Sequence, residues 1–393
     1  MKIKAICCLG LIMLIASFAT AQVSKVPAGL PCGPTISPSP TLFVNWPEFR
    51  FDPKHSGCNP YEYILSRATV GNLALRWKYT ADDYVYSSPA VANGVVYVGS
   101  ADTNLYALNA STGVPLWKYP TGDIVFSSPA VANGLVYIGA FDNNASVLDA
   151  LNAATGVLVW QYPTGSVSTG PAVANGVVYV GADDRAVFAL NATTGALLWK
   201  YTTGSGVGSS PAVANGVVYV GCSDGNLYAL NAATGDRLWS YPTGSVESSP
   251  AVADGVVYVG SDDYNVYALD ASTGALRWKY ATGSYVDSSP AIANGVVYIP
   301  SYDYNVYALN ASTGALLWKY TTGALLDSSP AVANGVVYVG SDDGNLYALN
   351  SSTGALLWEY TIGNDIDSSP AVANGFVYVG SYDHNLYAFH LPN

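Results

Sequence analysis

Residues 88–119 read SPAVANGVVYVGSADTNLYALNASTGVPLWKY, and this stretch decides the fold. It contains short apolar runs separated by turns. Asn93-Gly94 lies between the first two runs, and such a pair favours a tight hairpin because both residues of a type I′ turn need a positive φ. Residues 95–98 are apolar without alternation, which is typical of a strand covered on both faces. The stretch therefore predicts a sheet of short antiparallel strands.

The same pattern recurs along the whole chain. Its tryptophans are 39 to 43 residues apart, at Trp77, Trp117, Trp160, Trp199, Trp239, Trp278, Trp318 and Trp358. Tandem units of about forty residues with four strands each are typical of propeller blades. We therefore predict an all-β, eight-bladed β-propeller of four-stranded antiparallel blades over residues 73–391.

The two ends of the repeat region complement one another. Residues 73–79 form an extra fourth strand ahead of the first complete unit, whereas the last unit stops after its third strand at residues 387–389. The N-terminal strand is therefore expected to complete the last blade, which removes the exposed edge at the ring seam. On this basis, deletion of residues 22–79 should cost much more stability than deletion of residues 22–60.

The first 21 residues have the features of a secretory signal peptide. Lys2 and Lys4 precede an apolar run, and Ala-Thr-Ala at residues 19–21 supplies a small-residue cleavage site. We expect residues 1–21 to be removed and residues 22–72 to form a non-repetitive lead-in segment. The protein should then be secreted, into the periplasm or outside the cell.

The remaining cysteines are interpreted in that oxidising setting. Cys32 and Cys58 both lie in the lead-in segment and are predicted to form a disulfide bond. Cys222 takes a position filled by Ser or Ala in other repeats, so we expect a small buried residue there.

Charge limits the classes of partner. Without the leader, 13 basic residues accompany 27 acidic ones, a net charge of −14. Nucleic acid and anionic membrane surfaces are therefore poor partners, because phosphate binding needs clustered Lys and Arg. We expect a monomer that is not inserted in a membrane after signal cleavage.

Seven units contain the complete pattern A-x-N/D-x-x-T-G-x-x-x-W, as in residues 107–117. This pattern resembles the tryptophan-docking motif of PQQ-repeat (quinoprotein alcohol dehydrogenase-like and BamB-like) eight-bladed propellers. The resemblance implies that the repeat tryptophans pack between blades. Residues 46–52 and 69–77 also resemble the lead-in segment of that superfamily. Its members include PQQ-dependent alcohol dehydrogenases and the assembly lipoprotein BamB, so the resemblance implies a fold rather than a function.

The sequence offers little support for catalysis. A quinoprotein dehydrogenase resembling this family would need an aromatic platform, oxygen ligands for Ca²⁺ and a carboxylate base. All tryptophans except Trp46 are assigned to docking, so few remain to form the aromatic platform. The adjacent cysteine pair that the resemblance implies is present only as Cys7-Cys8, which falls in the signal peptide. The three histidines, His55, His384 and His390, are scattered. We therefore predict no catalytic, cofactor-binding or metal-ligating residues, with PQQ and Ca²⁺ as the alternative cofactors.

A ligand is expected on one face of the ring. The turns after strands one and three of each blade share a face, on which the Asn-Gly and Thr-Gly turns are nearly uniform. The opposite face varies, and variable loops on a rigid scaffold carry recognition. Three residues before each repeat's proline, the series runs Tyr86, Phe126, Ser168, Gly208, Glu247, Asp287, Asp327 and Asp367. Its acidic and aromatic members are candidate ligand residues, and the second-hairpin turns add Tyr264, Tyr302, Tyr304 and Tyr382. Acidic and aromatic side chains together suit a cation, a basic peptide or a sugar.

Three functions remain open on the sequence. The first is a non-catalytic binding or scaffold propeller whose ligand is a protein, a peptide or a glycan. The second is a PQQ-dependent dehydrogenase, and the third is a BamB-like scaffold for outer-membrane protein assembly.

Overall fold

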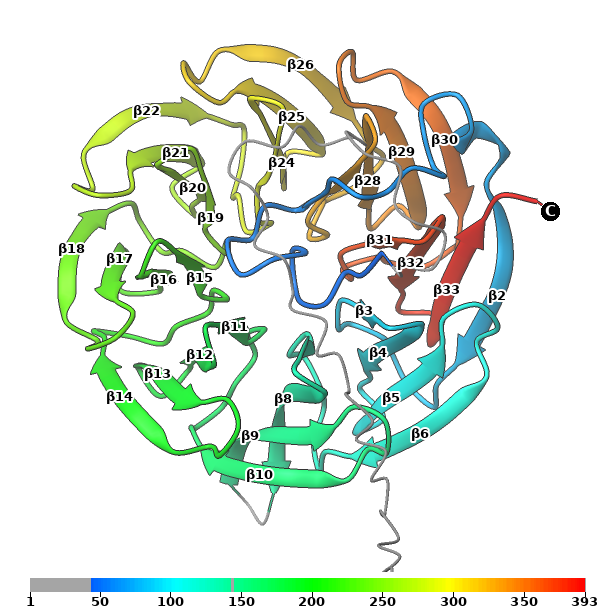
Figure 1. The fold of residues 1–393 in the computed structure, drawn as a ribbon. Coiled ribbons are helices and arrows are strands. Elements are labelled where there is room, and N and C mark those ends of the chain that lie inside the picture. The colour runs from blue at the N-terminus through cyan, green and yellow to red at the C-terminus, as the bar shows by residue number, and fades with distance from the viewer. Residues whose placement is uncertain (1–43, 143–144, 393) are drawn as a thin grey trace, which may run out of the picture.

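A computed structural model describes residues 44–142 and 145–392 of the chain. They form a ring of eight sheets arranged as the blades of a propeller (Figure 1). Within the described residues, one 3-10 helix, η1 (Val70–Asn72), accompanies the strands. None of the helices there has the length and apolar character needed to cross a bilayer. The predicted all-β, eight-bladed fold is confirmed.

Each blade has four antiparallel strands, from the inner strand at the axis to the outer strand at the rim. Blades 1 to 4 comprise β3 (Ala90–Ala92), β4 (Val95–Gly99), β5 (Asn104–Asn109) and β6 (Pro115–Pro120); β7 (Ala130–Ala132), β8 (Leu135–Asp142), β9 (Ala145–Asn152) and β10 (Leu158–Pro163); β11 (Ala172–Ala174), β12 (Val177–Ala182), β13 (Ala186–Asn191) and β14 (Leu197–Thr202); and β15 (Ala212–Ala214), β16 (Val217–Cys222), β17 (Asn226–Asn231) and β18 (Arg237–Pro242).

Blades 5 to 8 follow the same order. They comprise β19 (Ala251–Ala253), β20 (Val256–Gly260), β21 (Asn265–Asp270) and β22 (Leu276–Ala281); β23 (Ala291–Ala293), β24 (Val296–Ser301), β25 (Asn305–Asn310) and β26 (Leu316–Thr321); β27 (Ala331–Ala333), β28 (Val336–Gly340), β29 (Asn345–Asn350) and β30 (Leu356–Thr361); and β31 (Ala371–Ala373), β32 (Phe376–Gly380) and β33 (Asn385–His390) with β2 (Ala74–Thr80).

The ring closes through its two ends. β2 pairs antiparallel with β33, with Trp77 opposite Ala388 and Thr80 opposite Asn385. The N-terminal strand thus completes blade 8, as predicted, and no sheet edge is left open at the seam.

Adjacent blades are joined by the repeat tryptophans. In every blade the indole N–H donates to a backbone carbonyl of the next blade, as Trp199 does to Ala232 at 2.9 Å. The glycine of the Thr-Gly turn makes room for the ring, because a Cβ on Gly235 would lie 2.8 Å from Trp199. The Thr-Gly glycine is therefore fixed by two requirements at once, indole contact and a positive φ, which is 76° at Gly235.

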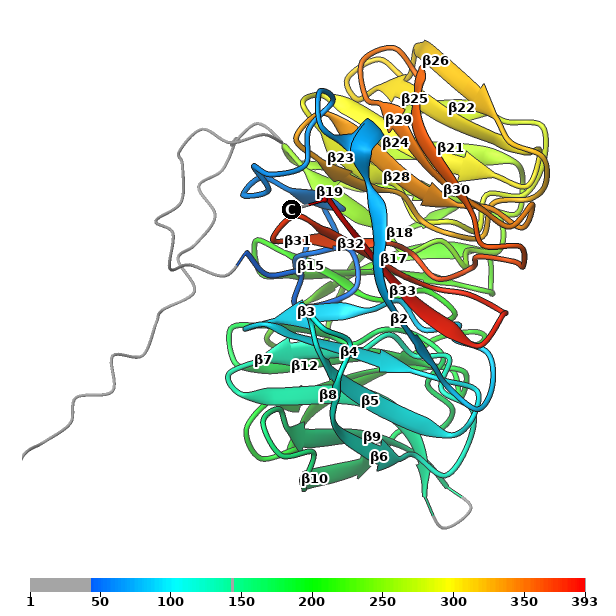
Figure 2. The same ribbon diagram turned by 90° about the vertical axis from the view of Figure 1, so that its right-hand side faces the viewer.

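The lead-in segment lies at the axis. Residues 46–59, here called the axial segment, run past the inner strands and bond to each blade (Figure 1). They lie at one side of the ring, as Figure 2 shows. This is the side of the Asn-Gly turns, since Asn45 accepts from the Asn93 amide and Val44 exchanges two hydrogen bonds with Asn374.

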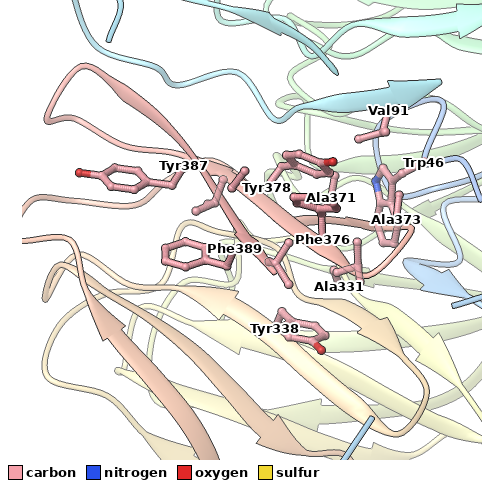
Figure 3. Close-up of a cluster of buried hydrophobic side chains, with 14 of the residues drawn as sticks. Trp46, Val91, Ala331, Tyr338, Ala371, Ala373, Phe376, Tyr378, Tyr387 and Phe389 are labelled. Atoms are coloured by element: carbon pink, nitrogen blue, oxygen red, sulfur yellow. The ribbon is translucent and has the colours of Figure 1, made fainter. Parts of the chain in front are cut away.

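Apolar contacts reinforce this position. Trp46 is 2% exposed and packs in a buried cluster with Val91 and Ala373 (Figure 3). Further along, β1 (Cys58–Asn59) adds a short parallel strand to β27 of blade 7. The lead-in segment is thus part of the ring, and the contacts of residues 46–59 remove the reason for expecting a deletion of residues 22–60 to be mild.

Two of the sequence predictions concern residues outside the described part. The signal peptide, residues 1–21, lies there, and so does Cys32. Cys58 itself is buried in β1, and its bond to Cys32 stays a prediction. Cys222 is a free cysteine, fully buried in blade 4.

Candidate functional site

The candidate ligand residues lie on the face opposite the axial segment, here called the entry face because the chain enters each inner strand there. Two positions of each repeat meet on it. One is the residue three before the proline, such as Asp327, and the other follows a small residue in the second hairpin turn, such as Tyr302. The entry residue of one blade reaches the turn of the previous blade, as Asp327 reaches Tyr302, or the turn of its own blade, as Asp367 reaches Tyr382.

In blades 5 to 8 the entry position is always an acid, whereas the turn position alternates between aspartate and tyrosine. The Asp287 carboxyl lies within hydrogen-bonding range of Asp262 and Tyr302. Tyr302 donates its hydroxyl to Asp327, and Tyr382 donates to Asp367. We call the resulting row the acid–tyrosine arc; its members are Asp262, Asp287, Tyr302, Asp327, Asp342, Asp367 and Tyr382.

Three carboxylates converge at the centre of this arc. One oxygen from each of Asp327, Asp342 and Asp367 lies within 4.8 Å of the others, a spacing that could hold a metal ion or an ammonium group. One oxygen of Asp262, Asp287 and Asp342 is buried without a hydrogen-bond partner among the described residues. The arc thus offers acceptors that its own donors do not satisfy.

The crowding raises the pKa of these acids. Burial, reinforced by Asp262, raises the pKa of Asp287 to about 7. Burial and the neighbouring Asp367 charge raise the pKa of Asp342 to about 7, and burial raises that of Asp367 to about 6 against the opposing bond from Tyr382. The pKa values of Asp327 and Glu247 are also raised, chiefly by burial. Both protonated and ionised carboxyls are therefore present near neutral pH.

An aromatic patch continues the arc into blades 1 and 2. Tyr84 stacks on Tyr382 with ring centroids 5.1 Å apart, and Tyr86 packs edge-on to Tyr382 at 4.7 Å. Phe126 lies 5.3 Å from Tyr86 and is 54% exposed, although it is a large apolar side chain. Exposed aromatic faces beside carboxylates suit a chain that carries both positive and apolar groups.

The other candidates lie at the margin of this surface. Glu247 is close enough to Asp262 and Asp327 for their charges to raise its pKa. Tyr264 packs against Tyr285 at 5.1 Å and is 43% exposed. Tyr304 is 45% exposed at the tip of its turn, with a φ of 70°.

Sequence reasoning missed Asp262, Asp342 and Tyr84. The signal for the first two was present, because the turn position reads Asp262, Tyr302, Asp342 and Tyr382 in consecutive units. Only the tyrosines of that series were selected. Tyr84 precedes the entry residue of blade 1 by two positions, and no periodic feature of the repeat marks it.

The acid–tyrosine arc is poorly suited to bind PQQ. PQQ is an anionic quinone, whereas the charges of neighbouring acids already raise the pKa values of Asp287, Asp327, Asp342 and Asp367. The tryptophans that could serve as a platform pack between blades, and Trp46 is buried in the axial segment. The arc therefore does not fit an anionic quinone.

Comparison with protein families gives one match along nearly the whole ring. The profile of a family described as outer membrane protein assembly factor BamB matches residues 74–166, 143–249 and 242–392. No curated protein is a significant sequence match.

Solved structures share the fold. BamB from Moraxella catarrhalis superposes with a TM-score of 0.70 at 21% identity, covering 81% of this chain and 99% of that one. Quinohemoprotein alcohol dehydrogenase ADHIIG from Pseudomonas putida HK5 gives 0.76 at 18% identity, with 93% and 83% covered. A europium-containing methanol dehydrogenase gives 0.76 at 16% identity, with 88% and 98% covered. At these identities the likeness shows the architecture alone.

Proposed function

The chain belongs to the family described as outer membrane protein assembly factor BamB, and from that premise we propose that it is a non-catalytic binding propeller that holds a basic segment of a partner protein on its entry face. It acts outside the cytoplasm, in keeping with its leader-like N-terminus and the family's outer-membrane description. The partner is a protein rather than a glycan, because the arc presents charge more than hydroxyl-directed polar groups.

The acid–tyrosine arc is the observation that carries this proposal. Converging carboxylates with unsatisfied oxygens are complementary to Lys and Arg, which supply several donors each. The aromatic patch beside them adds faces for cation–π and apolar contact. A net charge of −12 for the whole chain steers basic partners toward the ring.

Calorimetric titration of decalysine tests the proposal. The wild type should bind, and the triple variant Asp327→Asn/Asp342→Asn/Asp367→Asn should bind about tenfold or more weakly, since charge-assisted bonds contribute roughly 1.5–3 kcal/mol each. A second titration with Ca²⁺ alone separates recognition of a cationic chain from metal binding.

A matched control removes the same charge elsewhere. Asp236, Asp254 and Glu359 are exposed and lie outside the arc, so the variant Asp236→Asn/Asp254→Asn/Glu359→Gln changes net charge equally. It should retain decalysine affinity to within about twofold, because removing distant surface charges changes only the long-range electrostatic attraction, which salt screens. Equal loss in both triple variants would assign binding to net charge and refute a site.

A redox function is the second candidate, favoured by the structural likeness to two quinoprotein dehydrogenases. It is tested by adding PQQ and Ca²⁺ to the purified protein and following dye-linked alcohol oxidation and quinone absorption. Turnover or a bound-quinone band would replace the binding proposal with an enzymatic one.

A further inference from the structure

The inner strands of a propeller have one unpaired edge, which faces the ring axis. Each edge presents N–H and C=O groups that need partners if water is excluded. In this protein, the axial segment reaches the residue at the middle of each inner strand, through its backbone amide in blades 1 to 7 and through its carbonyl in blade 8.

The axial segment supplies these partners in chain order. Its backbone carbonyls accept hydrogen bonds from the amides of Val91, Val131, Val213, Val252, Ile292 and Val332, at 2.5 to 2.9 Å. In blade 3 the acceptor is the Glu48 carboxyl, 3.0 Å from the Val173 amide. In blade 8 the Asn59 amide donates to the Val372 carbonyl at 2.7 Å.

Ionisable side chains of the segment are also buried against the ring. Arg50 is 1% exposed and donates to the Pro330 carbonyl, and His55, also 1% exposed, lies 3.1 Å from the Pro250 carbonyl. Glu62, just beyond the segment, is fully buried and accepts from the Gly375 amide at 2.9 Å. Polar groups are costly to bury without partners, and each of these three side chains has at least one partner on the blades, although Nε and Nη2 of Arg50 have none among the described residues. These bonds give the segment a specific docked position.

The ring has adapted to this segment at one residue. Serine hydroxyls link neighbouring blades around the axis, each accepting from a backbone amide of the blade before, in seven links at 2.8 to 3.1 Å. The eighth link is missing because Gly170 stands where the other blades carry serine. The φ of Gly170 is not positive, so conformation does not require glycine there. A Cβ at this position would lie 3.2 Å from the Cβ of Phe49 in the axial segment, 3.3 Å from the Ser128 carbonyl oxygen and 3.4 Å from the Ser210 hydroxyl.

We propose that the axial end of the ring on the Asn-Gly face is a peptide-binding surface whose ligand is residues 46–59 of the same chain. This internal peptide bonds to the inner strand of every blade and so connects the blades to one another. It also covers the unpaired edges of the inner strands on that face, which prevents a partner from adding a strand to them. Gly170 leaves the space that Phe49 occupies. In exchange, the ring lacks the serine hydrogen bond that the other blades make at this position.

Four proteins test the proposal: wild type, Gly170→Ser, Phe49→Gly and the double variant. Gly170→Ser restores the residue of the other blades, yet it should lower the melting temperature by about 2–4 °C because Phe49 must move. Phe49→Gly removes the Cβ that position 170 would meet, so in that background the same substitution should be neutral or stabilising, since the serine link can form. A substitution that stabilises in the wild-type background, or destabilises equally in both, overturns the proposal.

Hydrogen exchange distinguishes loss of docking from a local clash, because a local clash at position 170 would not change the exchange rates of amides in distant blades. In Gly170→Ser the bonded amides of blades 1, 2, 4, 5, 6 and 7 should exchange about tenfold faster together with that of blade 3. Acceleration confined to blade 3 would overturn the proposal. Gly208→Ser is the matched control, because its Cβ would meet only Glu247 at 3.7 Å; it should leave these amides unchanged. If Gly170→Ser does not fold, folding of the double variant supports the proposal, and its failure to fold contradicts it.

Discussion

The two faces of the ring carry the same repeats but differ in what covers them. On the Asn-Gly face the chain's own residues 46–59 bind, and the turns are nearly identical from blade to blade. On the entry face the corresponding positions vary. Blades 5 to 8 carry acidic residues there, and the adjoining blades 1 and 2 carry aromatic residues. The face with uniform turns is thus the one that binds the chain's own axial segment, and the face with variable turns is the one we propose for recognition of a partner. The predictions below separate these two roles.

Removal of a docking indole should have the largest effect. Trp199 is 7% exposed, and its N–H bonds to Ala232 next to the Thr-Gly turn. Trp199→Ala should lower the free energy of unfolding by about 3–5 kcal/mol, because a large buried side chain leaves a cavity between blades. Denaturant unfolding measures this loss. Leu198→Ala, at a neighbour that is 50% exposed, should cost less than about 0.5 kcal/mol; a similar cost for both would show that docking is not what stabilises the interface.

Binding at the entry face should depend on pH. The carboxyls of Asp287, Asp342 and Asp367 have pKa values raised to about 7, 7 and 6, so a bound Lys must displace protons at neutral pH. Affinity for decalysine should therefore rise about tenfold between pH 6 and pH 8. Titrations in buffers of different ionisation enthalpy should detect proton release. Affinity that is flat over this range would place the peptide away from the arc.

Stability should depend on pH in the opposite direction. These carboxyls titrate near 4 when unfolded but at about 6 to 7 when folded. Their contribution is complete below pH 4 and is lost as pH rises through the folded pKa values. The melting temperature should fall by about 2–4 °C between pH 5 and pH 8. In the Asp342→Asn/Asp367→Asn variant this slope should be shallower, whereas an unchanged slope would mean that other groups cause it.

The smallest effect should come from the backbone of one turn on the Asn-Gly face. Gly216 has a φ of 78° and open space around its Cβ position, so Gly216→Ala should cost about 1 kcal/mol through conformation alone. Gly71 lacks a positive φ, and its Cβ would meet the Leu357 carbonyl at an ordinary 3.6 Å. Gly71→Ala should therefore be neutral or slightly stabilising. Thermal unfolding of both variants checks the difference in sign.

Much of the fold was predictable because its determinants are local and repeated. The Asn-Gly pairs, the Thr-Gly turns and the tryptophan spacing each specify one feature of a blade, and their recurrence specifies the number of blades. The missing fourth strand of the last unit likewise required residues 73–79 to complete it. The candidate site was predictable in part, since Asp287, Asp327, Asp367, Tyr302 and Tyr382 occupy positions that the repeat itself defines.

The rest depended on how the blades are placed around the axis. Asp262 and Asp342 join the arc only because each blade brings its entry residue beside the turn of its neighbour, which strand patterns within one unit do not show. The axial segment has no repeat, so its sequence carries no period from which its contacts could be inferred. Its position is set by the unpaired edges of strands up to about 300 residues away, and by the space that Gly170 leaves for Phe49. Local sequence thus determined each blade, while the tertiary structure decided which groups the ring brings together, because those contacts exist only after all the blades have closed.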